Sequence, residues 1–148
     1  MHICRLLLVE DNPDDAFLFT RAAGVACPNM HVEVVGNAQE AQEALLPVGA
    51  AREPFSLIVS DLKMPRATGI QFIAWLRSQS EFQRVPVILL SSSAESRDVQ
   101  NAYTAGANLY MIKPNAFRDY RALVKQIGDF CVDPTTPVEA SFVVPSPL

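Results

Sequence analysis

Short apolar runs alternate along the chain with segments in which apolar residues recur every three or four positions. Four runs, at residues 3–9, 55–60, 85–91 and 108–112, are almost continuously apolar, which is typical of strands covered on both faces of a parallel sheet. The run at residues 31–35 alternates apolar and polar positions, which indicates an edge strand. Strand followed by helix, five times over, predicts an α/β fold with a doubly wound parallel sheet and helices on both faces.

Residues that favour a helix start precede the predicted helices. Asn12 stands before Pro13, and proline tolerates the missing N–H of a first helical position. Three further pairs have the spacing of a capping box, in which Ser, Thr or Asn comes three residues before Glu or Gln: Asn37 with Glu40, Thr68 with Gln71, and Ser92 with Glu95.

Apolar residues at helical spacing predict the face that each helix buries. They are Leu18, Ala22 and Val25 after Pro13, Ile73 and Leu76 after Thr68, and Val99, Ala102 and Tyr103 after Ser92. The stripe is clearest in the last helix, with Tyr120, Leu123, Val124, Ile127 and Cys131.

Composition narrows the class of protein. The 148 residues suit one domain, and 49% apolar with 19% charged residues is a globular composition. The net charge of -4 and the lack of a Lys/Arg cluster argue against nucleic acid as a direct partner, and no apolar run has a membrane-spanning length. We therefore expect a cytoplasmic protein. Cys4, Cys27 and Cys131 are an odd count without close spacing, which favours buried or idle thiols in a reducing cytoplasm.

The chain changes character after Cys131, which divides it into a domain at residues 1–131 and a Pro-rich tail at residues 132–148. We expect no effector domain in this tail, which carries no basic helix. Its apolar triplet at residues 142–144 has two interpretations. The tail is either a floppy end with an accidental apolar spot, or an arm that docks on this molecule or on a second copy. The sequence leaves both open.

Polar residues follow four of the predicted strands. Because sites in doubly wound sheets form at the carboxyl ends of the strands, these residues should converge at one edge of the sheet. They are Glu10 and Asp11, Asp61, Ser91, and Lys113.

Clustered carboxylates repel one another, and a divalent cation relieves that repulsion. Few, hard oxygen ligands favour Mg²⁺, and Lys113 on the other side would suit a phosphoryl group. Asp61 is the candidate nucleophile, since a carboxylate can form an acyl phosphate. Asp14 and Asp15, by contrast, should lie in the first turn of the first helix and meet its positive end.

Each of these residues has a simpler interpretation when taken alone. Asp61 could cap a turn, Lys113 could be a solvated surface lysine, and Ser92 an N-cap. Ser91 could be a strand-end hydroxyl bonded to backbone, and Tyr110 an aromatic packed in its strand. Their joint placement at one edge of the sheet favours the functional interpretation.

The motifs LLVED, LIVSDLKMPRATG, VPVILLSSS and AGANLYMIKP together resemble the receiver domain of two-component response regulators, of which the chemotaxis regulator is one. The resemblance covers residues 3–130 and implies a flavodoxin-like sheet of five strands in the order 2-1-3-4-5. It implies that Asp61 accepts a phosphoryl group from a phosphohistidine of a sensor histidine kinase. The protein would be a signalling phospho-acceptor that catalyses its own phosphorylation and dephosphorylation, with protein contacts as its output.

The resemblance also assigns roles around Asp61. Asp11, Asp61 and the backbone carbonyl of Lys63 would bind Mg²⁺, and Glu10 would hold a metal-bound water. Lys113 would pair with the phosphoryl group, and by analogy its peptide bond to Pro114 would be cis.

Ser91 would be the switch hydroxyl, and Tyr110 the aromatic that turns inward when Ser91 engages the phosphate. The change would be read out on the surface of the fourth helix, fifth strand and fifth helix. Two residues depart from the commonest pattern: Ser91 replaces a more frequent threonine, and Lys63 places a long cation over the phosphate, which should alter the phosphoryl lifetime.

A narrower resemblance is to single-domain regulators paired with bacterial phytochromes, some of which dimerise. It rests on the VEDNPDD opening and on a long connection at residues 48–57. We expect a homodimer, formed by the face of the fourth and fifth helices or by the tail. We expect its output to be a contact with a downstream protein target.

Four other functions make different demands on these residues. A phosphorelay shuttle would use the same residues. A pseudo-receiver that only binds partners would lack Asp61 or Lys113. A metal-dependent phosphatase with an aspartyl nucleophile needs a second acid two residues on, where Lys63 stands. A flavin carrier of this fold needs a Ser/Thr/Gly-rich loop after the first strand, where EDNPDD would repel the phosphate.

Overall fold

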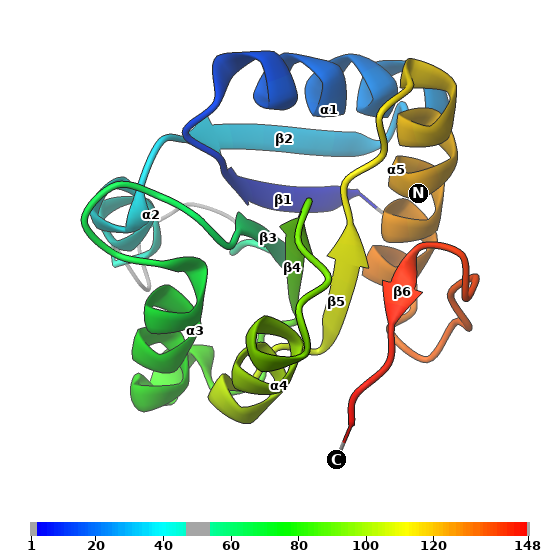
Figure 1. Cartoon of the computed structure of the whole chain (residues 1–148). Helices are drawn as coiled ribbons and strands as arrows, with labels where there is room; N and C mark the ends of the chain where they lie inside the picture. Colours follow the sequence, from blue (N-terminus) through cyan, green and yellow to red (C-terminus); the bar gives the residue numbers. More distant parts are fainter. Residues whose placement is uncertain (1–2, 47–53, 148) are drawn as a thin grey trace.

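The computed structural model describes residues 3–46 and 54–147 and contains one six-stranded sheet in the order β2-β1-β3-β4-β5-β6 (Figure 1). The strands are β1 (Cys4–Val9), β2 (Met30–Val35), β3 (Leu57–Asp61), β4 (Val87–Ser91), β5 (Leu109–Ile112) and β6 (Val143–Val144). The first five pair in parallel, so the doubly wound sheet with order 2-1-3-4-5 is confirmed, as is the edge position of β2. The sixth strand is an addition that the sequence did not predict.

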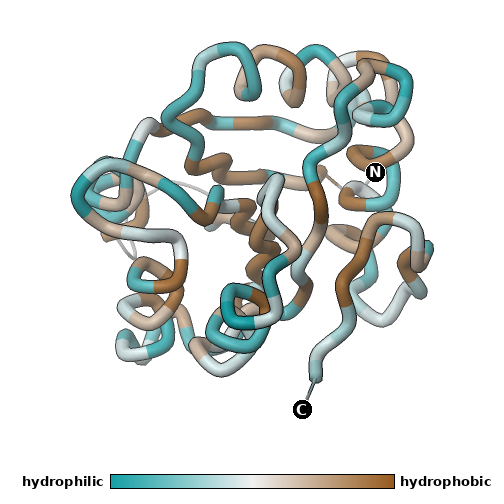
Figure 2. Tube along the Cα trace, viewed as in Figure 1, coloured by the Kyte–Doolittle hydropathy of each residue, from teal (hydrophilic) through white to brown (hydrophobic). Residues whose placement is uncertain are grey.

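Helices cover both faces of the sheet. They are α1 (Pro13–Ala26), α2 (Ala38–Leu45), α3 (Gly69–Ser78), α4 (Ser96–Ala105) and α5 (Phe117–Val132), with a short 3-10 helix η1 (Ser80–Phe82) after α3. Helices α1 and α5 lie on one face, and α2, α3 and α4 lie on the other (Figure 1). The central strands are almost wholly apolar (Figure 2) because each buries side chains in both layers.

Three of the four predicted helix starts are confirmed. The Asn12 side chain accepts the N–H groups of Asp14 and Asp15, and Pro13 occupies the first helical position. The Asn37 side chain accepts the N–H of Glu40. Thr68 and Gln71 form a complete capping box. These polar side chains satisfy N–H groups that have no partner within the helix.

The predicted start of α4 at Ser92 was wrong. The helix begins at Ser96, and its N-cap Glu95 makes no side-chain cap. Instead the Ser93 hydroxyl accepts the N–H of Glu95, and the Ser91 hydroxyl accepts the N–H of Ser93. These local bonds to side chains compete with helical hydrogen bonds, so the first turn of α4 begins later than predicted.

The predicted buried face of α1 was only partly right. Ala22 is fully buried, but Val25 is 57% exposed, and Phe19 and Ala23 are buried instead. The packing of α1 against α5 selects the face, and this contact joins segments far apart in the sequence. The predicted stripes of α3 and α5 are buried as expected.

The three cysteines are not all idle thiols, and that expectation was wrong. Cys4 at the start of β1 and Cys131 near the end of α5 form a disulfide across 127 residues of sequence. Cys27 remains a free thiol whose pKa is raised by burial. The pairing depends on α5 crossing the start of β1, which the spacing of cysteines along the chain cannot reveal.

Residues 133–147, here called the C-terminal arm, return to the domain along β5 (Figure 1). Strand β6 pairs antiparallel with β5, and the N–H of Ile112 donates to the carbonyl of Phe142 at 3.0 Å. Phe142 and Val143 pack against the core on the α5 side of the sheet. In this structure the arm therefore docks on its own molecule.

Within residues 3–46 and 54–147, every helix is too short or too polar to span a membrane. The long connection predicted at residues 48–57 lies mostly outside the described residues.

Candidate functional site

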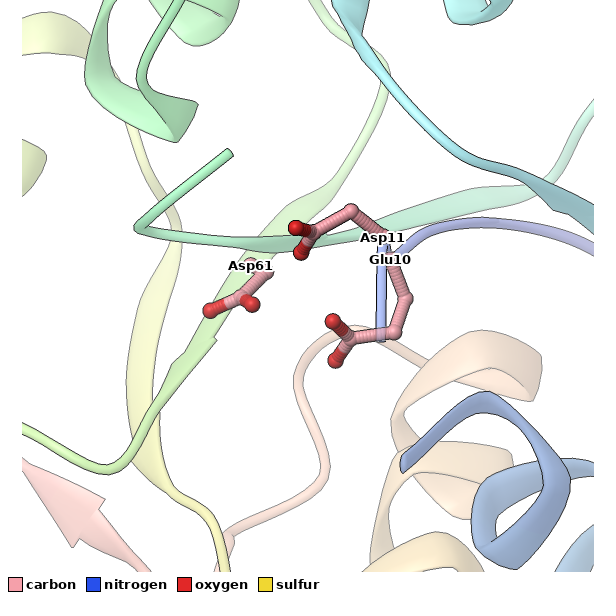
Figure 3. Close-up of side chains that lie close together, drawn as sticks. All are labelled: Glu10, Asp11 and Asp61. Atoms are coloured by element: carbon pink, nitrogen blue, oxygen red, sulfur yellow. The ribbon is translucent and has the colours of Figure 1, made fainter. Parts of the chain in front are cut away.

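Three carboxylates meet at the carboxyl ends of β1 and β3, and we call them the acidic group. Glu10 and Asp11 directly follow β1, and Asp61 is the last residue of β3. Because the two strands are neighbours and pair through Val9 and Ser60, the residues that follow lie side by side. One oxygen from each carboxylate lies within 4.8 Å of the others (Figure 3). The sequence predicted this convergence.

Lys113 reaches the acidic group from the end of β5. Its backbone N–H donates to the Ser91 carbonyl at 2.8 Å, which fixes the start of its side chain. Its ammonium lies 2.7 Å from Glu10 Oε1, 2.9 Å from Asp15 Oδ2 and 3.2 Å from Asp61 Oδ2. The simpler interpretation of Lys113 as a solvated surface lysine is therefore wrong, since its side chain is 10% exposed.

Asp15 was expected to serve only the positive end of α1, and it also pairs with Lys113. The pair depends on how far α1 is rotated about its axis when it packs against the sheet. No local pattern in the sequence carries that angle. Asp14, one residue earlier, is exposed in the same helical turn, as expected.

Burial and pairing shift the charges of the site in opposite ways. Burial raises the pKa of Glu10 to about 7, although the hydrogen bond from Lys113 opposes this. Burial alone would lower the pKa of Lys113, but hydrogen bonds to Glu10 and Asp15 and the charge of Asp61 outweigh it and raise that pKa. The raised pKa of Lys113 keeps its ammonium charged, and the raised pKa of Glu10 reflects the cost of a negative charge at a buried position.

Asp61 is held closely by the loop that follows it. Its Oδ1 accepts the N–H of Leu62 at 2.7 Å, and the Leu62 carbonyl accepts the N–H of Gly69 at 2.8 Å. A Cβ on Gly69 would lie 2.1 Å from the Asp61 carbonyl oxygen. Only glycine allows the first turn of α3 to come this near to Asp61. Lys63 lies in the same loop and is exposed.

The acidic group fits a magnesium ion. It offers three carboxylates, and Mg²⁺ prefers such hard oxygen ligands. Glu10, Asp11 and Asp61 are the residues that could hold the ion.

Ser91 and Tyr110 lie on neighbouring strands, β4 and β5, and share a hydrogen-bond partner. The Ser91 hydroxyl accepts the N–H of Ser93 at 3.0 Å, and the Tyr110 hydroxyl donates to the Ser93 carbonyl at 2.6 Å. Tyr110 is fully buried, and burial raises its pKa. Ser93, which the sequence interpretation passed over, joins the two predicted switch residues. The run of three serines at residues 91–93 was the available signal.

The expected cis bond between Lys113 and Pro114 was wrong, because this peptide bond is trans. The trans form is favoured even before proline, by about 0.5–1 kcal/mol. With this trans peptide bond, Lys113 is held in the site by its backbone hydrogen bond to Ser91 and by its ion pairs with three carboxylates.

Residues 6–125 match the model of the response regulator receiver domain. The chain belongs to this family. Receiver domains are signalling phospho-acceptors that sensor histidine kinases phosphorylate, and they are not enzymes in the ordinary sense. The resemblance inferred from the four motifs is therefore confirmed.

Known relatives agree with this assignment. The chain is 29% identical to the probable methanogenesis regulatory protein FilR2 of Methanothrix harundinacea (strain 6Ac), over 84% of this chain and 81% of that protein. Two other curated relatives are longer, and the match spans 54% of their length.

Two solved structures are similar over almost the whole chain. The phosphorylated cyanobacterial phytochrome response regulator RcpA has a TM-score of 0.81 and 28% identity, covering 91% of this chain and 98% of that one. The bacteriophytochrome response regulator RtBRR has a TM-score of 0.71 and 29% identity, covering 94% of this chain and 83% of that one.

Proposed function

We propose that this protein accepts a phosphoryl group on Asp61 from a sensor histidine kinase, in a reaction that depends on Mg²⁺. The observation that carries the proposal is the meeting of Asp61, Glu10, Asp11 and Lys113 at one edge of the sheet. The group combines a nucleophile, oxygen ligands for a metal and a cation for the phosphoryl oxygens, which are the parts that phosphoryl transfer needs.

In the proposed reaction, one carboxylate oxygen of Asp61 attacks the phosphorus of a phosphohistidine. The new P–O bond forms as the P–N bond breaks, and the imidazole nitrogen leaves with the bonding electron pair. Bound Mg²⁺ would offset the negative charge of the carboxylates and of the transferred group. Lys113 would donate hydrogen bonds to the phosphoryl oxygens, and Glu10 is the most buried carboxylate beside them.

The same site supports dephosphorylation without a further protein. Water attacks the phosphorus, the P–O bond to Asp61 breaks, and inorganic phosphate and a proton are released as the carboxylate is restored. In our proposal the backbone carbonyl of Lys63 would be a metal ligand beside Asp11 and Asp61, and Glu10 would bind water next to the metal.

Ser91 and Tyr110 form the proposed switch. The Ser91 hydroxyl would leave the N–H of Ser93 to bind a phosphoryl oxygen, which changes the partner that also holds the Tyr110 hydroxyl. The change would then reach the surface formed by α4, β5 and α5. Protein contacts on that surface would be the output.

The partner kinase that we propose is a bacterial phytochrome. This rests on the similarity to RcpA and RtBRR, which are response regulators of cyanobacterial phytochrome and of bacteriophytochrome. The experiment is phosphotransfer from a radiolabelled, autophosphorylated phytochrome kinase in the presence of Mg²⁺, beside other histidine kinases. We expect label on the wild type within seconds to minutes and none on Asp61→Asn.

Chelation of Mg²⁺ should stop the transfer. Label on Asp61→Asn, or transfer that survives chelation, would contradict the proposed site. Transfer from other kinases but not from phytochromes would keep the site and reject the partner.

We also propose a homodimer, formed either by the α4 and α5 surface or by the C-terminal arm. Removing the residues after Pro134 and measuring the solution mass separates the two contacts. A fall from dimer to monomer assigns the contact to the arm, and an unchanged dimer assigns it to the helices. A monomeric full-length chain, with and without beryllofluoride, would contradict the proposal.

A further inference from the structure

Asp15 contacts the site without belonging to the acidic group. It lies in the first turn of α1, where the Asn12 side chain accepts its N–H, and its carboxylate faces the ammonium of Lys113 at 2.9 Å. Neither the metal site nor the nucleophile uses it. Its ion pair with Lys113 therefore has no role in the reaction as proposed above.

The pairing of Lys113 is already complete. An ammonium group has three N–H donors, and Glu10, Asp15 and Asp61 each lie within ion-pair distance of it, at 2.7, 2.9 and 3.2 Å. A phosphoryl group on Asp61 needs a donor from the same ammonium. The ammonium must therefore loosen at least one of these three contacts to reach the phosphoryl oxygens.

The three pairs differ in how easily they can be given up. The Glu10 side chain is 4% exposed, so bulk water cannot readily replace its contact with Lys113. Asp61 is the residue that carries the phosphoryl group. The Asp15 side chain is 29% exposed, so water can replace its lost partner.

The position of Asp15 also favours its release. Its carboxylate sits at the positive end of α1, which stabilises a negative charge whether or not Lys113 is near. The Asn12 cap holds the backbone of Asp15 in place. Breaking the ion pair therefore leaves the helix start intact.

We propose that Asp15 is a positioning residue that binds Lys113 while Asp61 is unmodified and releases it to the phosphoryl group. The inference rests on the proposed function of Asp61. Asp15 competes with the phosphoryl group for Lys113 and so favours the unmodified protein. Removal of its charge must then strengthen binding of a phosphoryl group, because the competing pair exists in only one of the two states.

Beryllofluoride, which binds Asp61 as a phosphoryl mimic, tests this by titration calorimetry at saturating Mg²⁺. Asp15→Asn keeps the size of the side chain and removes its charge. We expect it to bind beryllofluoride about three to ten times more tightly than the wild type. Asp14→Asn is the matched control: it removes the same charge from the neighbouring residue, which is exposed and makes no side-chain contact with Lys113 among the described residues. We expect it to change the affinity less than about twofold.

Two results would overturn the inference. Equal gains in Asp15→Asn and Asp14→Asn would mean that net charge alone is responsible. Weaker binding by Asp15→Asn would mean that Asp15 holds Lys113 in its productive position. Both variants should keep the unfolding midpoint of the wild type within the range of ordinary surface changes.

A crystal structure with Mg²⁺ and beryllofluoride gives a second measurement that does not depend on affinity. We expect the ammonium of Lys113 to lie beyond ion-pair distance from Asp15 and to contact a fluorine atom. An ammonium that still lies near 2.9 Å from Asp15 would contradict the exchange. Failure of the proposed function looks different, because wild type and Asp61→Asn would then both fail to bind beryllofluoride, and the exchange would fall with it.

Discussion

The hydroxyl of Tyr103 lies 2.6 Å from the carbonyl of Val144 and donates a hydrogen bond to it, which fastens β6 to α4. The same hydroxyl accepts the N–H of Tyr110 at 3.0 Å. Tyr110 is thus held through its backbone by Tyr103 and through its own hydroxyl by the Ser93 carbonyl. The C-terminal arm and the proposed switch residue therefore share the Tyr103 hydroxyl as a hydrogen-bond partner. We expect a change in the position of either one to shift this hydroxyl and so affect the other.

Tyr103→Phe should destabilise the protein by about 1–2 kcal/mol. The change leaves the Val144 carbonyl without its donor and the Tyr110 N–H without its acceptor. Urea unfolding measures the loss, and hydrogen exchange at the Tyr110 amide should become faster. In a chain cut after Pro134 the Val144 bond is already absent, so the same substitution should cost less. An equal cost in both backgrounds would contradict the coupling between arm and α4.

Reduction of the Cys4–Cys131 disulfide should lower the free energy of unfolding by about 2–4 kcal/mol. The bridge closes a loop of 127 residues and so removes much freedom from the unfolded chain. Urea unfolding with and without dithiothreitol measures the effect, and Cys4→Ser should match the reduced protein. Cys27→Ser is the control, because Cys27 is a free thiol. It should leave the response to dithiothreitol unchanged, and a wild type insensitive to dithiothreitol would disprove the contribution.

The parallel sheet and the acidic group were predictable because both follow from local rules. Continuous apolar runs mark strands buried on two faces, and parallel strands carry the residues after their ends to one edge. These two rules were enough to predict that Glu10, Asp11 and Asp61 lie close together. The capping side chains of Asn12 and Thr68 act within a few residues, so they too could be found from the sequence.

The remaining features depend on how whole elements pack. The Asp15 contact requires the rotation of α1, and the disulfide requires the path of α5 across β1. Strand β6 has two residues in a Pro-rich segment, so it carries no strand pattern of its own and forms because β5 offers a free edge. The cis bond before Pro114 was inferred by analogy, and no local residue pattern required it.

Lys63→Ala should shorten the life of the phosphorylated state, by up to about fivefold. Lys63 lies two residues after Asp61 in an exposed part of the loop, where its cation can attract the phosphoryl oxygens and its side chain can hinder water. The measurement is loss of label from the purified phosphoprotein. Lys125→Ala removes the same charge from an exposed position on α5 and should decay like the wild type. Equal decay of Lys63→Ala and wild type would refute this role.

Gly69→Ala should both destabilise the protein and slow its phosphorylation. A Cβ at this position would lie 2.1 Å from the Asp61 carbonyl oxygen and 2.9 Å from a methyl group of Leu89, so either β3 or α3 must move. The expected loss in the free energy of unfolding is about 1–3 kcal/mol. Since the movement falls on the backbone of Asp61, the rate of phosphorylation by a small-molecule phosphodonor should fall as well.

Gly24→Ala provides the matched control for that prediction. Gly24 lies within α1, and a Cβ there would meet nothing within 4 Å. The same substitution should therefore stabilise the protein, by about 0.5–1 kcal/mol, because alanine favours the helix and restricts the unfolded chain. Phosphorylation of Gly24→Ala should match the wild type. If Gly69→Ala is as stable and as readily phosphorylated as Gly24→Ala, the close approach of α3 to Asp61 does not position the nucleophile.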